Sequence, residues 1–279
     1  MHKIIVLLLV LLVNVFSVTP EYLWVGSYTI EHYNNGVYLA YSHKQASAFT
    51  SLMSWLINWK NLDIDYKWNH NYKDAAVNET VFEGQDFNIN EFLIFVSHGY
   101  RGGMVINKYN TSTTYAMDIS NQYPNTRSWD FGNSYTKWII MGSCHTILDE
   151  HVTVWGTTFY FYDQIFDGVH SIMGYKSDGR NVYDGGPIGR FPLEWVHNRR
   201  SIWNAWRVSV REEVYEGCNQ DVTPSMVGVW GTVNGQDWDA DTELFYAVYD
   251  ALTPHNETLG AWIGYGMMYR HVEYGDPEY

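Results

Sequence analysis

The chain has 279 residues and a formal net charge of −14 at pH 7, with 31 acidic and 17 basic residues. Nucleic acids and anionic lipids bind basic surfaces, so this charge argues against both classes of partner. The length suits one large domain with a sizeable core, or a domain with an appendage. The 23 Tyr and 13 Trp indicate either a tyrosine-rich extracellular surface or aromatic platforms for peptides or sugars.

The first 17 residues have the pattern of a signal peptide. A short basic region, Met1–Lys3, precedes an apolar run from Ile4 to Phe16, and the small Ser17 suits a cleavage site. The run is shorter than the about 20 apolar residues of a membrane span. We therefore expect residues 1–17 to be removed and the mature protein, without a membrane span, to be secreted or held at the cell surface.

A strand, a turn and a helix are predicted next. Residues 21–29 have a β-rich composition, and Asn34-Asn35-Gly36 is a turn signal. Between His43 and Trp59, apolar residues recur at helical spacing, which predicts an amphipathic helix.

Four short, uniformly apolar runs follow, at Phe92–Val96, Trp138–Met141, Ser171–Tyr175 and Met226–Trp230. Such runs are typical of strands in a parallel sheet that is covered on both faces. Helices are predicted around Trp155–Phe166 and from Pro192 to Tyr215, with Pro192 in the first turn.

This alternation of strands and helices predicts an α/β fold, a three-layer sandwich with a mainly parallel sheet. Beyond about Gly235 the pattern changes to aromatic and glycine-rich runs, Leu244–Tyr249 and Gly260–Val272, which we expect to pair as a terminal β-ribbon. The predicted organisation is a signal peptide at 1–17, an α/β domain at 18–234 and a C-terminal β extension at 235–279, packed on the same domain.

Two reactive residues directly follow two of the predicted strands. His98 ends the segment FLIFVSH, and Cys144 ends WIIMGSC. The carboxyl ends of parallel strands lie at one edge of the sheet, so these side chains meet if the two strands are neighbours. A thiolate nucleophile needs a proton carrier, usually an imidazole. Gly99 would let the backbone turn its N–H toward a substrate carbonyl, and with the N–H of Cys144 it would form an oxyanion hole.

The two motifs, 46 residues apart, resemble those of the caspase-like cysteine peptidases, which include caspases, legumains, gingipains and clostripain. The chain also resembles exported prokaryotic domains of unassigned function with the same His-Gly and small-Cys arrangement. The resemblance covers roughly residues 20–231 and implies a caspase-like fold. It implies that His98 transfers protons, that Cys144 is the nucleophile, and that the amides of Gly99 and Cys144 bind the oxyanion. Ser143 and Thr146 stand where caspases have Ala and Gly, so the resemblance does not extend to caspase specificity.

The chain after the third apolar run contains three charged residues, Lys176, Asp178 and Arg180. If this segment forms the substrate pocket, we expect these side chains to line it.

A disulfide between Cys144 and Cys218 is the default interpretation of two cysteines in an exported protein, and it would stabilise the fold by roughly 4 kcal/mol. The predicted topology opposes it, because Cys218 follows a helix that runs back to the other edge of the sheet, roughly 17 to 20 Å away. A disulfide spans less than about 7 Å between Cα atoms. We therefore predict that Cys144 is a free thiol.

Two metal sites are weaker alternatives. A zinc site would draw on a set of residues that lacks any standard ligand spacing: His98, Cys144, His145, His151 and His170. In the acidic run 237–243, the carboxylates of Asp237, Asp239 and Asp241 could bind calcium, although a solvated acidic turn is the simpler interpretation. No other cofactor is predicted.

The sequence thus predicts an exported cysteine peptidase-like protein whose substrate is a peptide or protein. The alternative is a catalytically inactive, caspase-like extracellular binding module for a surface protein or a glycan, because a fold does not by itself imply an activity.

Overall fold

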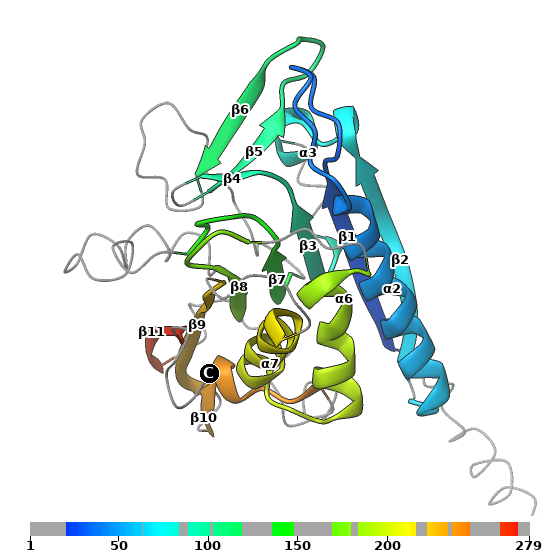
Figure 1. Ribbon diagram of the computed structural model, residues 1–279. Helices are drawn as coiled ribbons and strands as arrows, with labels where there is room; N and C mark the ends of the chain where they lie inside the picture. Colours follow the sequence, from blue (N-terminus) through cyan, green and yellow to red (C-terminus); the bar gives the residue numbers. More distant parts are fainter. Residues whose placement is uncertain are drawn as a thin grey trace, which may run out of the picture.

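The computed structural model describes residues 21–62, 64–83, 89–100, 103–118, 136–147, 169–179, 184–215, 222–233, 236–245 and 263–272. Within these ranges the chain forms an α/β fold around one sheet of eight strands (Figure 1). The predicted fold class, with a mainly parallel sheet, is confirmed. None of the described helices is both long enough and apolar enough to cross a membrane.

Five neighbouring strands of the sheet are parallel, in the order β2, β1, β3, β7, β8. They are β1 (Glu21–Thr29), β2 (Ile64–Lys73), β3 (Phe92–Val96), β7 (Trp138–Met141) and β8 (Ser171–Tyr175). The sequence pattern predicts all of them except β2. That strand lies at the edge of the sheet and most of its residues are partly or fully exposed, so it carries no apolar run.

The remaining strands of the sheet are antiparallel. β9 (Pro224–Val233) contains the fourth predicted run and pairs antiparallel with β8. β10 (Gln236–Asp239) and β11 (Ile263–His271) both pair antiparallel with β9, so the C-terminal strand extends the main sheet. The sequence predicts that residues 244–249 pair with this C-terminal strand as a ribbon. Residues 246–249 lie outside the described part of the chain.

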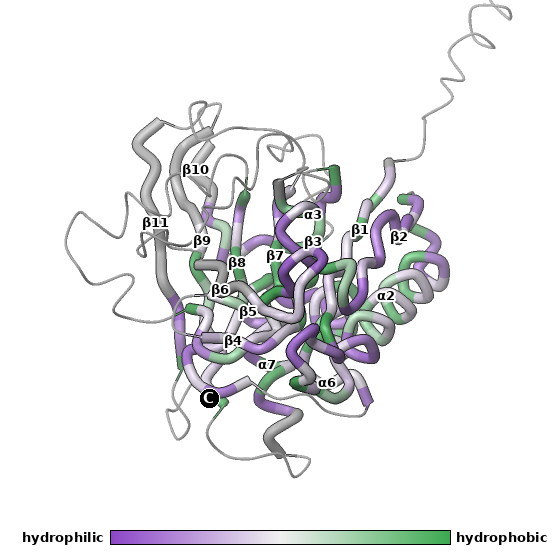
Figure 2. The backbone as a smooth tube through the Cα atoms, turned by 90° about the horizontal axis from the view of Figure 1, so that it is seen from above, coloured by the Kyte–Doolittle hydropathy of each residue, from purple (hydrophilic) through white to green (hydrophobic). Residues whose placement is uncertain are grey.

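The helical segments are α2 (Ser42–Trp59), η1 (Asp74–Ala76), α3 (Glu79–Glu83), α6 (Gly186–Pro192), η3 (Leu193–His197), α7 (Ile202–Tyr215) and η4 (Ala240–Thr242). Alternate residues of the central strands enter two cores. Phe92, Ile94 and Val96 pack in one core with residues of α2, α6 and α7. Leu93 and Phe95 pack in the other core, with residues of α3 and of the strand β5 described below. Burial on both faces explains why β3 and its neighbour β7 are uniformly apolar, and Figure 2 shows both strands in the middle of the molecule.

The helix predicted from Pro192 to Tyr215 is divided into separate segments. α6 already begins at Gly186 with Pro187 in its first turn, η3 follows it directly, and α7 begins anew at Ile202. The prediction that Pro192 lies in a first turn is therefore wrong, because Pro192 is the last residue of α6. The helix predicted around 155–166 lies outside the described residues.

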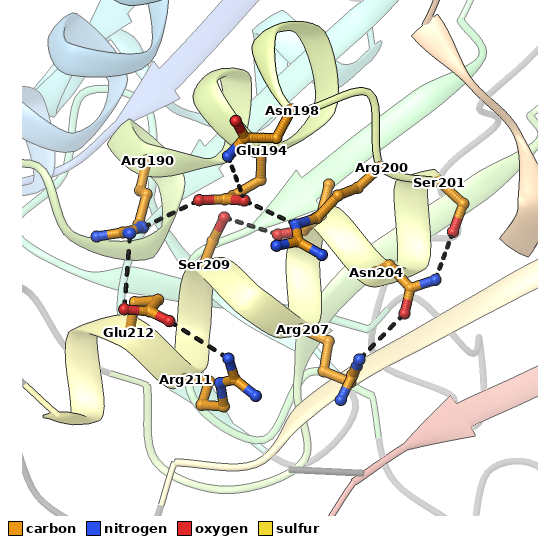
Figure 3. Close-up of polar contacts among 11 residues, drawn as sticks. Arg190, Glu194, Asn198, Arg200, Ser201, Asn204, Arg207, Ser209, Arg211 and Glu212 are labelled. Atoms are coloured by element: carbon orange, nitrogen blue, oxygen red, sulfur yellow. Dashed lines mark hydrogen bonds and ion pairs between the residues drawn. The ribbon is translucent and has the colours of Figure 1, made fainter.

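A buried glutamate explains the break before α7. The side chain of Glu194 is 3% exposed and accepts hydrogen bonds from Asn198 Nδ2 at 2.9 Å and Arg200 Nε at 2.8 Å (Figure 3). It also pairs with Arg190 at 3.4 Å. The chain turns at Arg199, which has a φ of 54°, and this turn lets its neighbours reach the carboxylate. Burial opposes the charge, but these contacts outweigh it and lower the pKa of Glu194.

A second, smaller sheet begins directly after His98. Its strands are β4 (Gly99–Tyr100), β5 (Gly103–Asn107) and β6 (Thr114–Asp118), all antiparallel. They lie at the top of Figure 1, above the carboxyl ends of β3 and β7. The sequence pattern does not predict this sheet, because its strands are short and form no uniformly apolar run.

Candidate active site

His98 and Cys144 follow neighbouring parallel strands at the same level. β3 pairs with β7 so that Phe92 lies opposite Trp138, an offset of 46 residues. Beyond the strand ends the same offset brings Ser97 Oγ within 3.2 Å of Ser143 Oγ, and the next residue of each segment is His98 and Cys144. The interval between the two predicted residues therefore equals the register offset of their strands.

Gly99 packs against the backbone of Cys144. A Cβ at position 99 would lie 1.9 Å from the carbonyl oxygen of Cys144 and 2.4 Å from its amide nitrogen. The carbonyl of His98 accepts the N–H of Val105 at 2.7 Å. In a trans peptide the C=O and the following N–H point in opposite directions, so the N–H of Gly99 points away from β5. Only glycine fits at position 99 without moving the backbone.

Backbone amides surround the sulfur of the half-buried Cys144, which is a free thiol. The N–H of Gly179 donates to Sγ at 3.3 Å, and the amides of Gly99 and Cys144 also lie within hydrogen-bonding reach of it. Burial raises the pKa of the thiol and the carboxylate of Asp178 raises it further, and together they outweigh the amides. Cys218 lies outside the described residues.

The imidazole of His98 is half-buried, and neither ring nitrogen has a hydrogen-bond partner in the described part of the chain. Its backbone is held instead, because its N–H donates to the Tyr33 hydroxyl at 2.5 Å. The Tyr33 and His98 rings pack with their centroids 5.3 Å apart. Burial lowers the pKa of His98, so the ring is neutral near pH 7 and can accept a proton.

Buried hydroxyl groups join the strand ends beneath these residues. Ser97 Oγ and Ser143 Oγ are 3.2 Å apart. The Thr146 hydroxyl donates to the Ser143 carbonyl at 3.1 Å and accepts the N–H of Tyr175 at 3.3 Å. Ser143 and Thr146, which differ from the caspase pattern, thus cross-link β3, β7 and β8. Ser97 was not predicted as part of the site, although it stands 46 residues before Ser143, the same interval that separates His98 from Cys144.

The structure describes two of the three predicted pocket residues, and both lie on the loop after β8 beside Cys144. His145 Nδ1 contacts the carbonyl oxygen of Lys176 at 3.0 Å, and His145 Nε2 pairs with Asp178 Oδ1 at 3.0 Å. Arg180 lies outside the described residues. The loop therefore brings the Asp178 carboxylate close enough to influence the thiol.

The described residues include no group of three or more His, Cys, Asp and Glu side chains that could hold a metal ion. Of the zinc candidates, His170 immediately precedes β8 and so lies at the amino ends of the parallel strands, whereas Cys144 lies at their carboxyl ends. His170 pairs with Glu243 at 3.1 Å. His151 lies outside the described residues.

The acidic run considered for calcium already contacts a cation. Arg270 Nε lies 2.7 Å from Asp241 Oδ2. Burial and the neighbouring Asp241 raise the pKa of Asp239 to about 6. The side chain of Asp237 is outside the described part of the structure.

We expect Asp178→Asn to accelerate alkylation of Cys144 by iodoacetamide about twofold to fivefold at pH 7 to 8. Removing the negative charge lowers the pKa of the thiol, which increases the thiolate fraction. The effect is modest because the Asp178 side chain is 82% exposed and solvent screens its charge. The measurement is the alkylation rate of Cys144 by peptide mass spectrometry across pH. Asp65→Asn, on the exposed face of β2, is the control, and equal rates in the two variants would contradict the prediction.

The chain is similar to one family of domains and to solved protein structures. A crystal structure described as the Arg specific cysteine proteinase gingipain R is similar, with a TM-score of 0.39 and 8% sequence identity. The similarity covers 78% of this chain and 57% of that chain, so this chain spans less than two thirds of that protein's length. No curated protein matches the sequence.

A family model matches residues 24–247, a range that includes both His98 and Cys144. The family is described as a domain of unknown function, DUF6345. Because the match covers most of the chain, this protein belongs to the DUF6345 family.

Proposed function

We propose that this protein is an exported cysteine peptidase-like enzyme that hydrolyses peptide bonds through Cys144, with His98 as the proton-transfer group. The observation that carries this proposal is the shared register: the two residues follow adjacent parallel strands at the same level. The amides of Gly99 and Cys144 beside the sulfur support it.

The chemistry follows from the charge states of the two groups. The pKa of the thiol is raised and that of His98 is lowered, so the resting pair is a neutral thiol and a neutral imidazole. His98 accepts the thiol proton as Sγ attacks the substrate carbonyl, and the two amides bind the oxyanion that forms. His98 then protonates the leaving amine. Water hydrolyses the thioester, with His98 taking its proton, and restores the thiol.

An electrophilic peptidyl chloromethyl ketone is expected to label the wild-type protein at Cys144. Labelling should disappear in Cys144→Ala and fall at least about 100-fold in His98→Ala, because general acid–base catalysis contributes about that much or more. Intact-mass and peptide mass spectrometry measure the rate and the position. His197→Ala, a histidine of η3 that packs against Trp59, is the control and should label at the wild-type rate. Rapid labelling of His98→Ala would contradict the proposal.

One observation favours the alternative of an inactive binding module for a glycan or surface protein. Trp55 and Trp59 on α2 are 53% and 54% exposed, and their rings stack with centroids 5.1 Å apart. Exposed indoles are suited to stacking against a ligand. If this were the function, the peptidyl probe would leave wild-type Cys144 unlabelled.

A further inference from the structure

Tyr33 contacts His98 in two ways, although it lies 65 residues earlier in the chain. Its hydroxyl accepts the N–H of His98, and its ring packs on the imidazole at an interplanar angle of 31°. Tyr33 is 5% exposed, and burial raises the pKa of its phenol, so the hydroxyl stays neutral. Ser97 lies within hydrogen-bonding reach of the same hydroxyl.

The loop that carries Tyr33 is itself anchored. The Asp74 carboxylate accepts the N–H groups of Glu31 and His32, each at 2.8 Å. On the other side of Tyr33, the Asn107 side chain accepts the N–H of Asn34 at 2.7 Å. Contacts from two other segments thus hold the residues on both sides of Tyr33, so its hydroxyl is a fixed acceptor.

The position of the His98 imidazole depends on how firmly its backbone is held. Its ring nitrogens have no hydrogen-bond partner among the described residues, so within that part of the chain no side chain orients the imidazole by a hydrogen bond. Its backbone is fixed at both ends, by Tyr33 at the N–H and by Val105 at the carbonyl. The neighbouring Gly99 amide belongs to the same short segment. Movement of the His98 backbone would therefore displace both the imidazole and the Gly99 N–H.

We propose that Tyr33 is a positioning residue that holds His98 in place to serve Cys144. This inference rests on the proposed function. The Tyr33 hydroxyl fixes the backbone of His98 through a hydrogen bond, and the Tyr33 ring packs on one side of the imidazole. Tyr33 acts through His98 and does not itself react.

A double-mutant cycle tests this role. Tyr33→Phe removes only the hydroxyl, and we expect it to slow probe labelling of Cys144 about tenfold, the effect of losing one hydrogen bond of ordinary strength. In the His98→Ala background the same change should have little effect, because Tyr33 acts through His98. Tyr38→Phe, on the same loop with a side chain that is 55% exposed, is the matched control and should label like the wild type.

A second measurement does not depend on activity. In Cys144→Ala protein, NMR follows the titration of the His98 imidazole with and without Tyr33→Phe. We expect the midpoint to move upward when the hydroxyl is lost, because a less firmly held ring is better hydrated. If wild-type protein is not labelled but the midpoint still moves, the peptidase proposal fails while the positioning role stands. An unchanged midpoint, or equal labelling losses with and without His98, would overturn the role of Tyr33.

Discussion

Gly99→Ala is expected to reduce labelling of Cys144 by the peptidyl probe at least about 100-fold. The added Cβ would lie 1.9 Å from the carbonyl oxygen of Cys144, so the ends of β3 and β7 must separate. A displacement of about 1 Å is enough to cost that much in rate. The variant should also lose about 1 to 3 kcal/mol of unfolding free energy through overpacking. Probe kinetics and urea unfolding measure the two effects separately.

Gly228→Ala is the matched control for this change. Gly228 lies in β9 opposite Ser171, the first residue of β8, and so at the opposite end of the parallel strands from Cys144. A Cβ added at this position would lie 3.1 Å from the Cβ of Ala240. We expect some loss of stability but the wild-type labelling rate for the folded protein. If Gly99→Ala were labelled as fast as Gly228→Ala, the contact between Gly99 and Cys144 would have no functional importance.

Glu243→Ala is expected to lower the free energy of unfolding by about 1 to 3 kcal/mol, the usual cost of leaving a buried hydrogen-bond donor without its acceptor. The Glu243 side chain is 1% exposed. It accepts the indole N–H of Trp138 at 2.8 Å and contacts His170 Nδ1 at 3.1 Å. The substitution leaves the indole N–H without its acceptor inside the core. Urea unfolding followed by tryptophan fluorescence measures the loss.

Thr242→Ala provides the comparison for Glu243. Its hydroxyl donates to the carbonyl of Asp239 in an exposed position, and such changes usually alter stability by about 0.5 kcal/mol or less. Both residues lie near the amino ends of β7 and β8, whereas Cys144 follows the carboxyl end of β7. Neither change should therefore alter probe labelling of the folded protein. A loss below about 1 kcal/mol for Glu243→Ala would show that the buried contact contributes little.

The predicted elements that proved correct are those in which a local pattern reports burial. β3 and β7 are uniformly apolar and β8 is mostly so, because both faces are covered, and α2 has one apolar face because it packs on one side of the sheet. β2 was missed because an exposed edge strand leaves no apolar pattern. The break before α7 was missed because its cause is a set of side chains that converge on Glu194, which helical periodicity does not record.

The same distinction applies to the residues of the candidate site: those that follow a predicted strand could be found from the sequence, and the one on a loop could not. His98, Gly99 and Cys144 could be found because each follows a recognisable strand. Asp178 could be placed near them because it follows the strand after Cys144. Tyr33 could not be found, because it lies on a loop with no pattern other than a turn signal.

The sequence by itself determined that β3, β7 and β8 are buried and that a histidine and a cysteine follow two of them at an interval of 46 residues. Only the tertiary structure decided that these strands are neighbours, in a register that equals this interval. It also brought the Gly179 amide to the sulfur and the Tyr33 hydroxyl to the His98 backbone. Hydrophobic periodicity reports whether a residue is buried, but the identity of its neighbours depends on strand order and register, which arise only when distant segments pack together.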